Sequence, residues 1–161
     1  MRPTIIGGVG LLLLAGCTDG LLHSETRPVP DGAWQEAWQP EFNFDVNDTV
    51  GQYDTYIDIR HTGDYPYSNL ILFVTLKRPN GHAVLDTVEI PLADATGRWL
   101  GKGLGFIRSE GAEAHVLYKY NNRFPQSGRY GVVLEQAMRV DPLQGVIDVG
   151  VSIEQHKELG Q

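Results

Sequence analysis

Five histidines are the side chains most able to bind a metal ion, and their spacing does not favour such a site. They lie at positions His23, His61, His82, His115 and His156. Zinc ligands usually come in close pairs such as His-x-x-x-His. No such pair occurs, so we expect neither a metal ion nor a cofactor. A zinc site assembled from different strands would leave no such spacing and stays the alternative.

Nucleophilic catalysis has one local candidate, Ser68, which lies near His61 and Asp64. Catalytic triads are assembled across a fold, so this proximity is weak evidence, and a turn-capping role explains Ser68 better. Glycoside hydrolysis would need a pair of carboxylates. No pair stands out among the many available, which include Asp54, Asp58, Asp64, Asp86, Glu89, Asp94 and Glu135. We therefore predict that the protein is not an enzyme.

Glycine is densest in residues 97–105. A phosphate-binding loop would need a preceding parallel strand and a following helix, and the sequence shows neither clearly. We interpret the segment as a structured loop that Trp99 and Leu104 hold against the domain. If Trp99 were exposed it would instead anchor a partner, because aromatic residues often do so at interfaces.

A second loop, residues 60–69, is rich in polar and aromatic side chains. Tyr65-Pro66-Tyr67 could stack on a sugar or receive a peptide, but it is also a common way to stiffen a turn. Sugar binding would require a row of exposed aromatic rings, and the sequence does not tell whether Trp34, Tyr65, Tyr67 and Trp99 share a face. From both loops we take as candidate partner-binding residues Tyr65, Tyr67, Asn69, Arg98 and Trp99.

Cys17, the only cysteine, follows Leu14-Ala15-Gly16 at the end of an apolar run. This order is a lipobox, and the run has the length of a signal-peptide core, too short to span a bilayer. We predict that residues 1–16 are a lipoprotein signal peptide and that Cys17 is lipidated. Each buried CH2 of the lipid would contribute about 0.8 kcal/mol of membrane affinity. A membrane is thus the first expected partner.

The charge of the mature chain argues against nucleic acid as a partner. Removing Arg2 from 13 basic residues leaves 12 against 20 acidic residues, a formal charge of −8. Phosphate binding needs a basic surface, which this chain does not offer. With its one cysteine lipidated, the fold has no disulfide. Oligomeric state is not indicated.

The rest of the chain divides into a tether and a β-domain. Residues 17–33 carry two prolines and little periodicity, and we interpret them as lipid anchor and flexible tether. Residues 34–161 are expected to form one domain. It begins with Trp34 and Trp38, four residues apart, which we place on one side of a short helical turn at the edge of the core.

Alternation of apolar and polar residues predicts strands through the rest of that domain. The expected strands are residues 53–60, 70–77, 83–92, 114–121, 130–138 and 146–154. Asn80-Gly81 predicts a hairpin between the second and third. Residues 125–130 are typical of a corner in which Tyr130 bonds back to the backbone. The fold class is all-β, an antiparallel β-sandwich, Ig-like or jelly-roll-like, with a small closed barrel as the alternative.

Several segments also resemble a known family, the gliding motility lipoprotein GldH family of Bacteroidetes. The stretches that carry the resemblance are RHTGDYPYSNL at 60–70, DTVEIPLAD at 86–94, GRWLGKGLG at 97–105, RFPQSGRY at 123–130 and EQAMRVDPLQGVIDVGVSIE at 135–154. The resemblance implies a cell-envelope lipoprotein associated with gliding, whose apparatus overlaps type IX secretion. It supplies no catalytic residues.

We therefore expect a non-catalytic, membrane-anchored structural or accessory subunit that contacts other envelope motility or secretion proteins. The alternative is a β-sandwich module that binds envelope or surface glycans. Thr18-Asp19-Gly20 has no dense acidic cluster after the cysteine, which favours an outer-membrane lipoprotein facing the periplasm.

Overall fold

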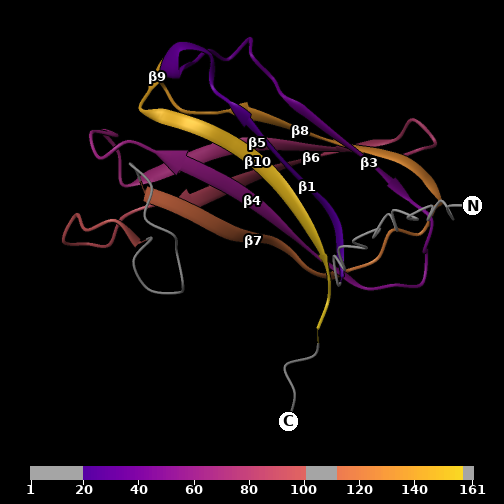
Figure 1. The fold of residues 1–161 in the computed structure, drawn as a ribbon. Helices are drawn as coiled ribbons and strands as arrows, with labels where there is room; N and C mark the ends of the chain where they lie inside the picture. The colour runs from indigo at the N-terminus through magenta and orange to yellow at the C-terminus, as the bar shows by residue number, and fades with distance from the viewer. Residues whose placement is uncertain (1–19, 101–111, 158–161) are drawn as a thin grey trace, which may run out of the picture.

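The computed structural model describes residues 20–100 and 112–157, and these residues form an antiparallel β-sandwich (Figure 1). Sheet 1 contains four strands in the order β1-β10-β4-β7, and sheet 2 contains four in the order β3-β8-β5-β6. β2 and β9 form a separate two-stranded ribbon. The strands are β1 Leu21–Pro28, β2 Ala33–Trp34, β3 Glu41–Val46, β4 Tyr53–His61, β5 Asn69–Lys77, β6 Ala83–Pro91, β7 Ala112–Asn122, β8 Gly128–Gln136, β9 Leu143–Gln144 and β10 Val146–Gln155.

The strand pairing is that of a jelly roll. β1 pairs with β10, β3 with β8, β4 with β7 and β5 with β6. Among these eight strands the first thus pairs with the last, the second with the second to last, and so on to the middle of the chain. The pairs β10–β4 and β8–β5 then join these hairpin-like pairs into the two sheets. All are antiparallel, as eight-stranded jelly rolls are. The predicted sandwich is confirmed, and its jelly-roll form is the one adopted.

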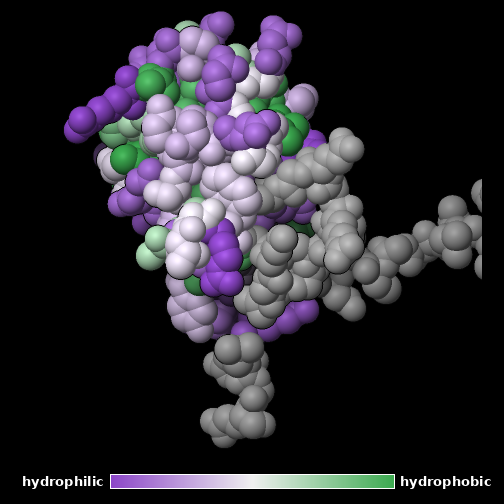
Figure 2. Space-filling view, turned by 90° about the vertical axis from the view of Figure 1, so that its left-hand side faces the viewer, coloured by the Kyte–Doolittle hydropathy of each residue, from purple (hydrophilic) through white to green (hydrophobic). Residues whose placement is uncertain are grey.

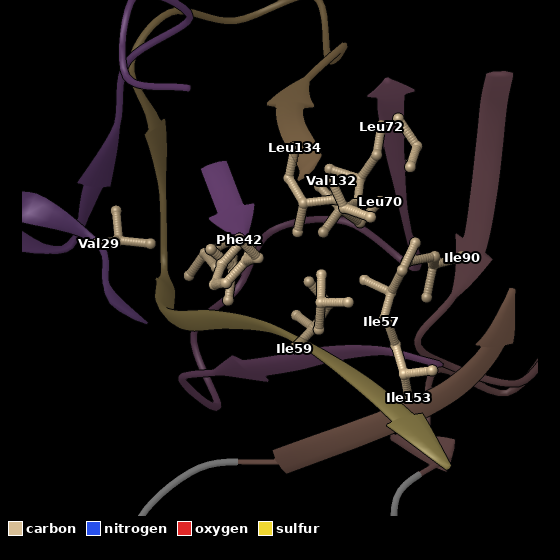
Figure 3. Close-up of a cluster of buried hydrophobic side chains, with 14 of the residues drawn as sticks. Val29, Phe42, Ile57, Ile59, Leu70, Leu72, Ile90, Val132, Leu134 and Ile153 are labelled. Carbon is tan, nitrogen blue, oxygen red and sulfur yellow. The ribbon is translucent and has the colours of Figure 1, made fainter. Parts of the chain in front are cut away.

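The core lies between the sheets because alternating apolar residues of the predicted strands face inward. On β4, Ile57 and Ile59 are buried, and on β10 Val149, Val151 and Ile153 are buried. Figure 3 shows Ile57, Ile59 and Ile153 of sheet 1 in one cluster with side chains of sheet 2, among them Leu72 and Leu134. Each such side chain removed from water contributes roughly 1.5–3 kcal/mol to folding.

The predicted hairpin and corner are both present. β5 and β6 pair in register from Asn69–Pro91 to Lys77–Ala83, and Gly81 takes the positive φ of 83° that the turn requires. At the corner, the Tyr130 hydroxyl donates to the carbonyl of Gln126 at 3.1 Å and accepts from its N–H at 3.3 Å. Tyr130 is itself buried in the core.

The predicted tether is wrong for most of its length. Residues 21–28 are strand β1, and residues 30–32 form a 3-10 turn. Apart from Leu22, the β1 side chains that pack toward the core are polar or charged, so the sequence shows no apolar alternation there. Yet the ring centroids of His23 and Phe44 lie 5.6 Å apart, and the Arg27 guanidinium carbon lies 5.1 Å from the ring centroid of Phe42. Such side chains cover a core edge with their apolar parts.

The predicted helical turn at Trp34 and Trp38 is also wrong, although the two rings do meet. Trp34 belongs to β2 and Trp38 closes a turn, its N–H donating to the carbonyl of Gln35 at 2.9 Å. The rings contact edge to face at 5.8 Å, and the Trp34 indole donates to the Trp38 carbonyl. Trp34 is fully buried. Pairing of Ala33 and Trp34 with β9 replaces the local helix.

Cys17 and the signal segment lie outside the described residues. Among residues 20–100 and 112–157, no helix has the length and apolarity needed to cross a membrane.

Candidate functional site

The loop of residues 60–69 and the described start of the glycine-rich segment, residues 97–100, meet at one end of the sandwich, which we call the loop end (residues 62–69 and 92–100). Backbone hydrogen bonds join its two stretches, because the N–H groups of Leu92 and Ala93 donate to the carbonyl of Ser68 at 2.8 and 3.0 Å. Aromatic rings pack beneath this junction. The ring centroid of Trp99 lies 4.5 Å from that of His61 and 6.4 Å from that of Tyr65. The loop end is therefore an ordered surface.

Asp94 builds the outer turn of the loop end. One oxygen of its carboxylate accepts from the Thr96 N–H, the Thr96 hydroxyl and the Arg98 N–H. The other oxygen accepts from the Arg98 guanidinium at 3.0 Å. These donors, the Thr96 hydroxyl above all, lower the pKa of Asp94 below its usual value. The turn thus presents Arg98 outward, with 82% of its side chain exposed.

The five candidate partner-binding residues occupy different depths of the loop end. Tyr65 is buried, 3% exposed, and its hydroxyl donates to the carbonyl of Asn69 at 3.0 Å. Tyr67 and Trp99 are half-buried, and the Asn69 amide donates to Glu89 at 2.7 Å. Tyr65 therefore supports the surface from below, and the other four side chains, of Tyr67, Asn69, Arg98 and Trp99, are accessible to a partner.

Figure 2 looks at this end of the molecule, where hydrophilic and hydrophobic residues are interspersed. The four described rings of Trp34, Tyr65, Tyr67 and Trp99 do not form the exposed row that sugar stacking would need, since Trp34 and Tyr65 are both buried. Leu104, predicted to hold the glycine-rich loop, lies outside the described residues, as does the stretch 101–105 as a whole.

A second site, which the sequence analysis missed, lies on the outer face of sheet 1. There a groove of about 390 Å³ crosses the four strands. It is lined by Ser24, Thr26, Asp58, Ile59, Arg60, Glu113, Ala114, His115, Asp148 and Ser152. We call it the sheet groove.

Asp58 is the centre of the sheet groove. Its carboxylate accepts hydrogen bonds from His115 Nδ1 and Ser152 Oγ, each at 2.5 Å. Ser152 Oγ lies 3.3 Å from Ser24 Oγ, which extends the network to the edge strand β1. The bond to Asp58 raises the pKa of His115 above its usual value. Next to this network, Arg60 forms an ion pair with Asp148.

Asp58, His115 and Ser152 do not form a catalytic triad. In a triad the histidine lies between the acid and the nucleophile and takes the hydroxyl proton. Here the carboxylate lies between the other two, and the serine hydroxyl donates to it. The arrangement fixes side chains in position and does not activate Ser152 as a nucleophile.

The signal that could have revealed the sheet groove was the polar half of the alternation. Asp58 and Arg60 face outward from β4, and Asp148 and Ser152 from β10, as their spacing predicted. What the spacing could not give is that these two strands are neighbours, with Gly150 between Thr26 and Asp58 in the cross-strand row. Gly150 leaves no side chain over this part of the face.

Two further histidines, His61 and His156, contact neighbouring groups of the fold. His61 is buried, and its Nδ1 lies 2.9 Å from the carbonyl of Thr62. His156 lies 2.8 Å from the carboxylate of Asp54, which also accepts from the N–H of Asn121. Within the part of the chain that the structure describes, no three histidine, cysteine or acidic side chains are grouped so as to hold a metal ion.

Comparison with known proteins connects this chain to one family. Its residues 22–153 match the family model described as GldH lipoprotein. A protein of Christiangramia forsetii, called gliding motility lipoprotein GldH homolog, is 34% identical over 151 residues, which are 89% of this chain and 90% of the relative. The gliding motility lipoprotein GldH of Flavobacterium johnsoniae is 32% identical over 158 residues, with 91% and 95% of the two chains covered.

Among solved structures, the fold is similar to a carbohydrate-binding module specific for non-crystalline cellulose. The TM-score is 0.37 at 13% identity, with 82% of this chain and 72% of that chain covered. This likeness is too distant to indicate what the chain binds. The matches in sequence, in contrast, run through nearly all the strands described above, from β1 to β10. The chain belongs to the GldH lipoprotein family.

Proposed function

We propose that this protein is a non-catalytic accessory subunit of a gliding motility apparatus, held at a membrane by lipid on Cys17. Membership of the GldH lipoprotein family carries this proposal. The apparatus overlaps type IX secretion, so the subunit serves envelope assembly or secretion where the organism does not glide. The lipobox supports the membrane attachment, and the sequence after Cys17 supports an outer-membrane lipoprotein that faces the periplasm.

The loop end is the proposed contact surface for other envelope proteins. It combines an exposed arginine, Arg98, with the half-buried rings of Tyr67 and Trp99. Arginine and aromatic residues are enriched where protein interfaces carry most of their binding energy. His61 and Tyr65 pack against the rings of Trp99 and Tyr67, and Asp94 holds Arg98. Less conformational entropy is therefore lost on binding than with a flexible loop.

The test is site-specific photocrosslinking in living cells. A photoreactive residue replaces Arg98 at the loop end or, as matched control, His82, which is exposed in the β5–β6 turn at the other end of the hairpin. Each is placed in the lipidated protein and in a Cys17→Ala form. We expect position 98 of the lipidated protein to capture motility or secretion subunits, and position 82 to capture few.

The proposal has two separable parts. Equal capture from positions 98 and 82 would reject the loop end as the contact surface. Full gliding or secretion in cells that carry only the Cys17→Ala form would reject a role that depends on the anchor. Turnover of an envelope substrate by the purified protein, retained on repeated purification, would contradict the non-catalytic assignment.

A further inference from the structure

We propose that the sheet groove binds a neutral oligosaccharide, laid across the strands of sheet 1. The groove lies on a sheet face and the loop end on the loops, so this site is separate from the proposed protein contact surface. A volume of about 390 Å³ is within the ordinary range of ligand sites, roughly 300–1,000 Å³. Four strands place its ends about 14 Å apart, which suits a short chain of sugar rings.

The lining has the hydrogen-bonding chemistry of a polyol site. Asp58 and Asp148 offer acceptor oxygens, Arg60 offers a rigid set of donors, and the hydroxyls of Ser24 and Thr26 can do both. Sugar hydroxyls also donate and accept hydrogen bonds. Of two neighbouring hydroxyls, one can donate to a carboxylate while the other accepts from the guanidinium beside it. Ordinary drug-like pockets are mainly apolar. Most side chains that line this groove are polar, which favours a polar ligand.

Charge separates this ligand from anionic ones. The lining carries three carboxylates, of Asp58, Glu113 and Asp148, against one arginine and one histidine. With His115 protonated, the contacting pairs Asp58–His115 and Asp148–Arg60 carry no net charge. These two pairs leave no unmatched positive charge for a phosphate or an acidic sugar, and the carboxylates of Asp58 and Asp148 would face its negative charge.

The groove is also fixed in shape before a ligand arrives. Asp58 is held by His115 and Ser152, and Arg60 by Asp148. The imidazole of His115 in turn stacks on Tyr56, with ring centroids 4.0 Å apart. Groups positioned in this way lose little freedom on binding, which favours affinity for a flexible sugar chain.

The first experiment uses histidine signals in NMR. The full-length lipidated protein, in nanodiscs and labelled on its histidine ring carbons, is titrated with a set of neutral tetrasaccharides: cello-, chito-, malto- and laminari-tetraose. His115 lies in the groove, and His82, in the turn between β5 and β6, is an internal control. We expect at least one sugar to shift the His115 signal saturably and to leave the His82 signal in place.

Variants then assign the binding to the groove. Thr26→Leu, on the exposed edge strand, fills the mouth of the groove, and Asp148→Asn removes a charged acceptor. Each should weaken binding about tenfold or more. Asp45→Asn, on an exposed position of β3 in the other sheet, should not. If Asp148→Asn lowers the melting temperature, Thr26→Leu still tests whether the sugar binds in the groove, because it removes neither partner of the Arg60–Asp148 ion pair.

Three results would overturn the proposal. In the first, no sugar in the set shifts His115. In the second, His115 and His82 shift together, or Thr26→Leu binds as the parent does. In the third, a cationic amine such as spermidine gives a saturable His115 shift while the sugars give none, which would make the groove an amine site.

Discussion

Nδ1 of His115 lies 2.5 Å from Oδ1 of Asp58, and this contact ties the edge strand β7 to the central strand β4. The carboxylate raises the pKa of His115. The contribution of this contact to the stability of the fold is therefore fully present at pH values below the ordinary histidine pKa. It is lost as the pH rises through the higher pKa that His115 has in the folded state.

The first prediction concerns that pKa. Asp58→Asn removes the charge that favours the protonated imidazole, so the pKa of His115 should fall toward or below its usual value of 6.5. An NMR pH titration of the histidine ring signals measures it. Asp45→Asn, on the outer face of the other sheet, is the control and should leave the His115 titration unchanged. An unaltered His115 pKa in Asp58→Asn would show that the contact is not formed in solution.

The second prediction concerns acid stability. Burial lowers the pKa of His61, so below about pH 6.5 the unfolded chain binds a proton that the folded chain does not. Because of His61, the free energy of unfolding should therefore decrease as the pH falls from about 6.5 toward the lower pKa of His61 in the folded state. His61→Phe should lose less stability than the parent between pH 7.5 and 5.5, measured by urea unfolding.

His82→Phe, at an exposed turn position, is the matched control for this comparison. Its free energy of unfolding should vary with pH as that of the parent does, because His61 is present in both proteins. Parallel pH curves for the parent and His61→Phe would mean that His61 does not titrate differently on folding.

The third prediction concerns the corner at Tyr130. Tyr130→Phe removes the hydroxyl that bonds both backbone groups of Gln126, and it should cost about 0.5–1.5 kcal/mol of unfolding free energy. Chemical denaturation measures the difference. Tyr120→Phe is the control, since Tyr120 is 65% exposed. An equal, small effect of both changes would argue against the corner bond as a stabilising contact.

The fourth prediction concerns Gly150, which lets β1 lie close to β10. A Cβ added there would lie 2.7 Å from the carbonyl oxygen of Glu25 and from Thr26 Oγ1. Gly150→Ala should therefore push β1 away and cost about 1–3 kcal/mol, the usual range for overpacking. Amide hydrogen exchange should become faster in β1 and stay unchanged in β6.

Gly63→Ala is the control, because a Cβ at position 63 would meet nothing within 4 Å. It should leave both the stability and the exchange rates near those of the parent. If Gly150→Ala behaved in the same way, β1 would have to be held less closely to β10 than the structure shows.

The sequence by itself determined the strands whose inward faces are apolar. β4, β5 and β10 follow the predicted alternation, and the Asn80-Gly81 hairpin and the Tyr130 corner are set by residues a few positions apart. These features are local, so propensity and period are enough to reveal them. The family was likewise readable from the segments themselves.

The tertiary structure alone decided what depends on contacts between distant residues. The polar residues of β1, among them His23 and Arg27, predict a tether, whereas in the fold the rings of Phe44 and Phe42 give them a place to pack. The sheet groove exists because β10 lies between β1 and β4. Strand neighbours far apart in sequence are chosen by global packing, which no local pattern records.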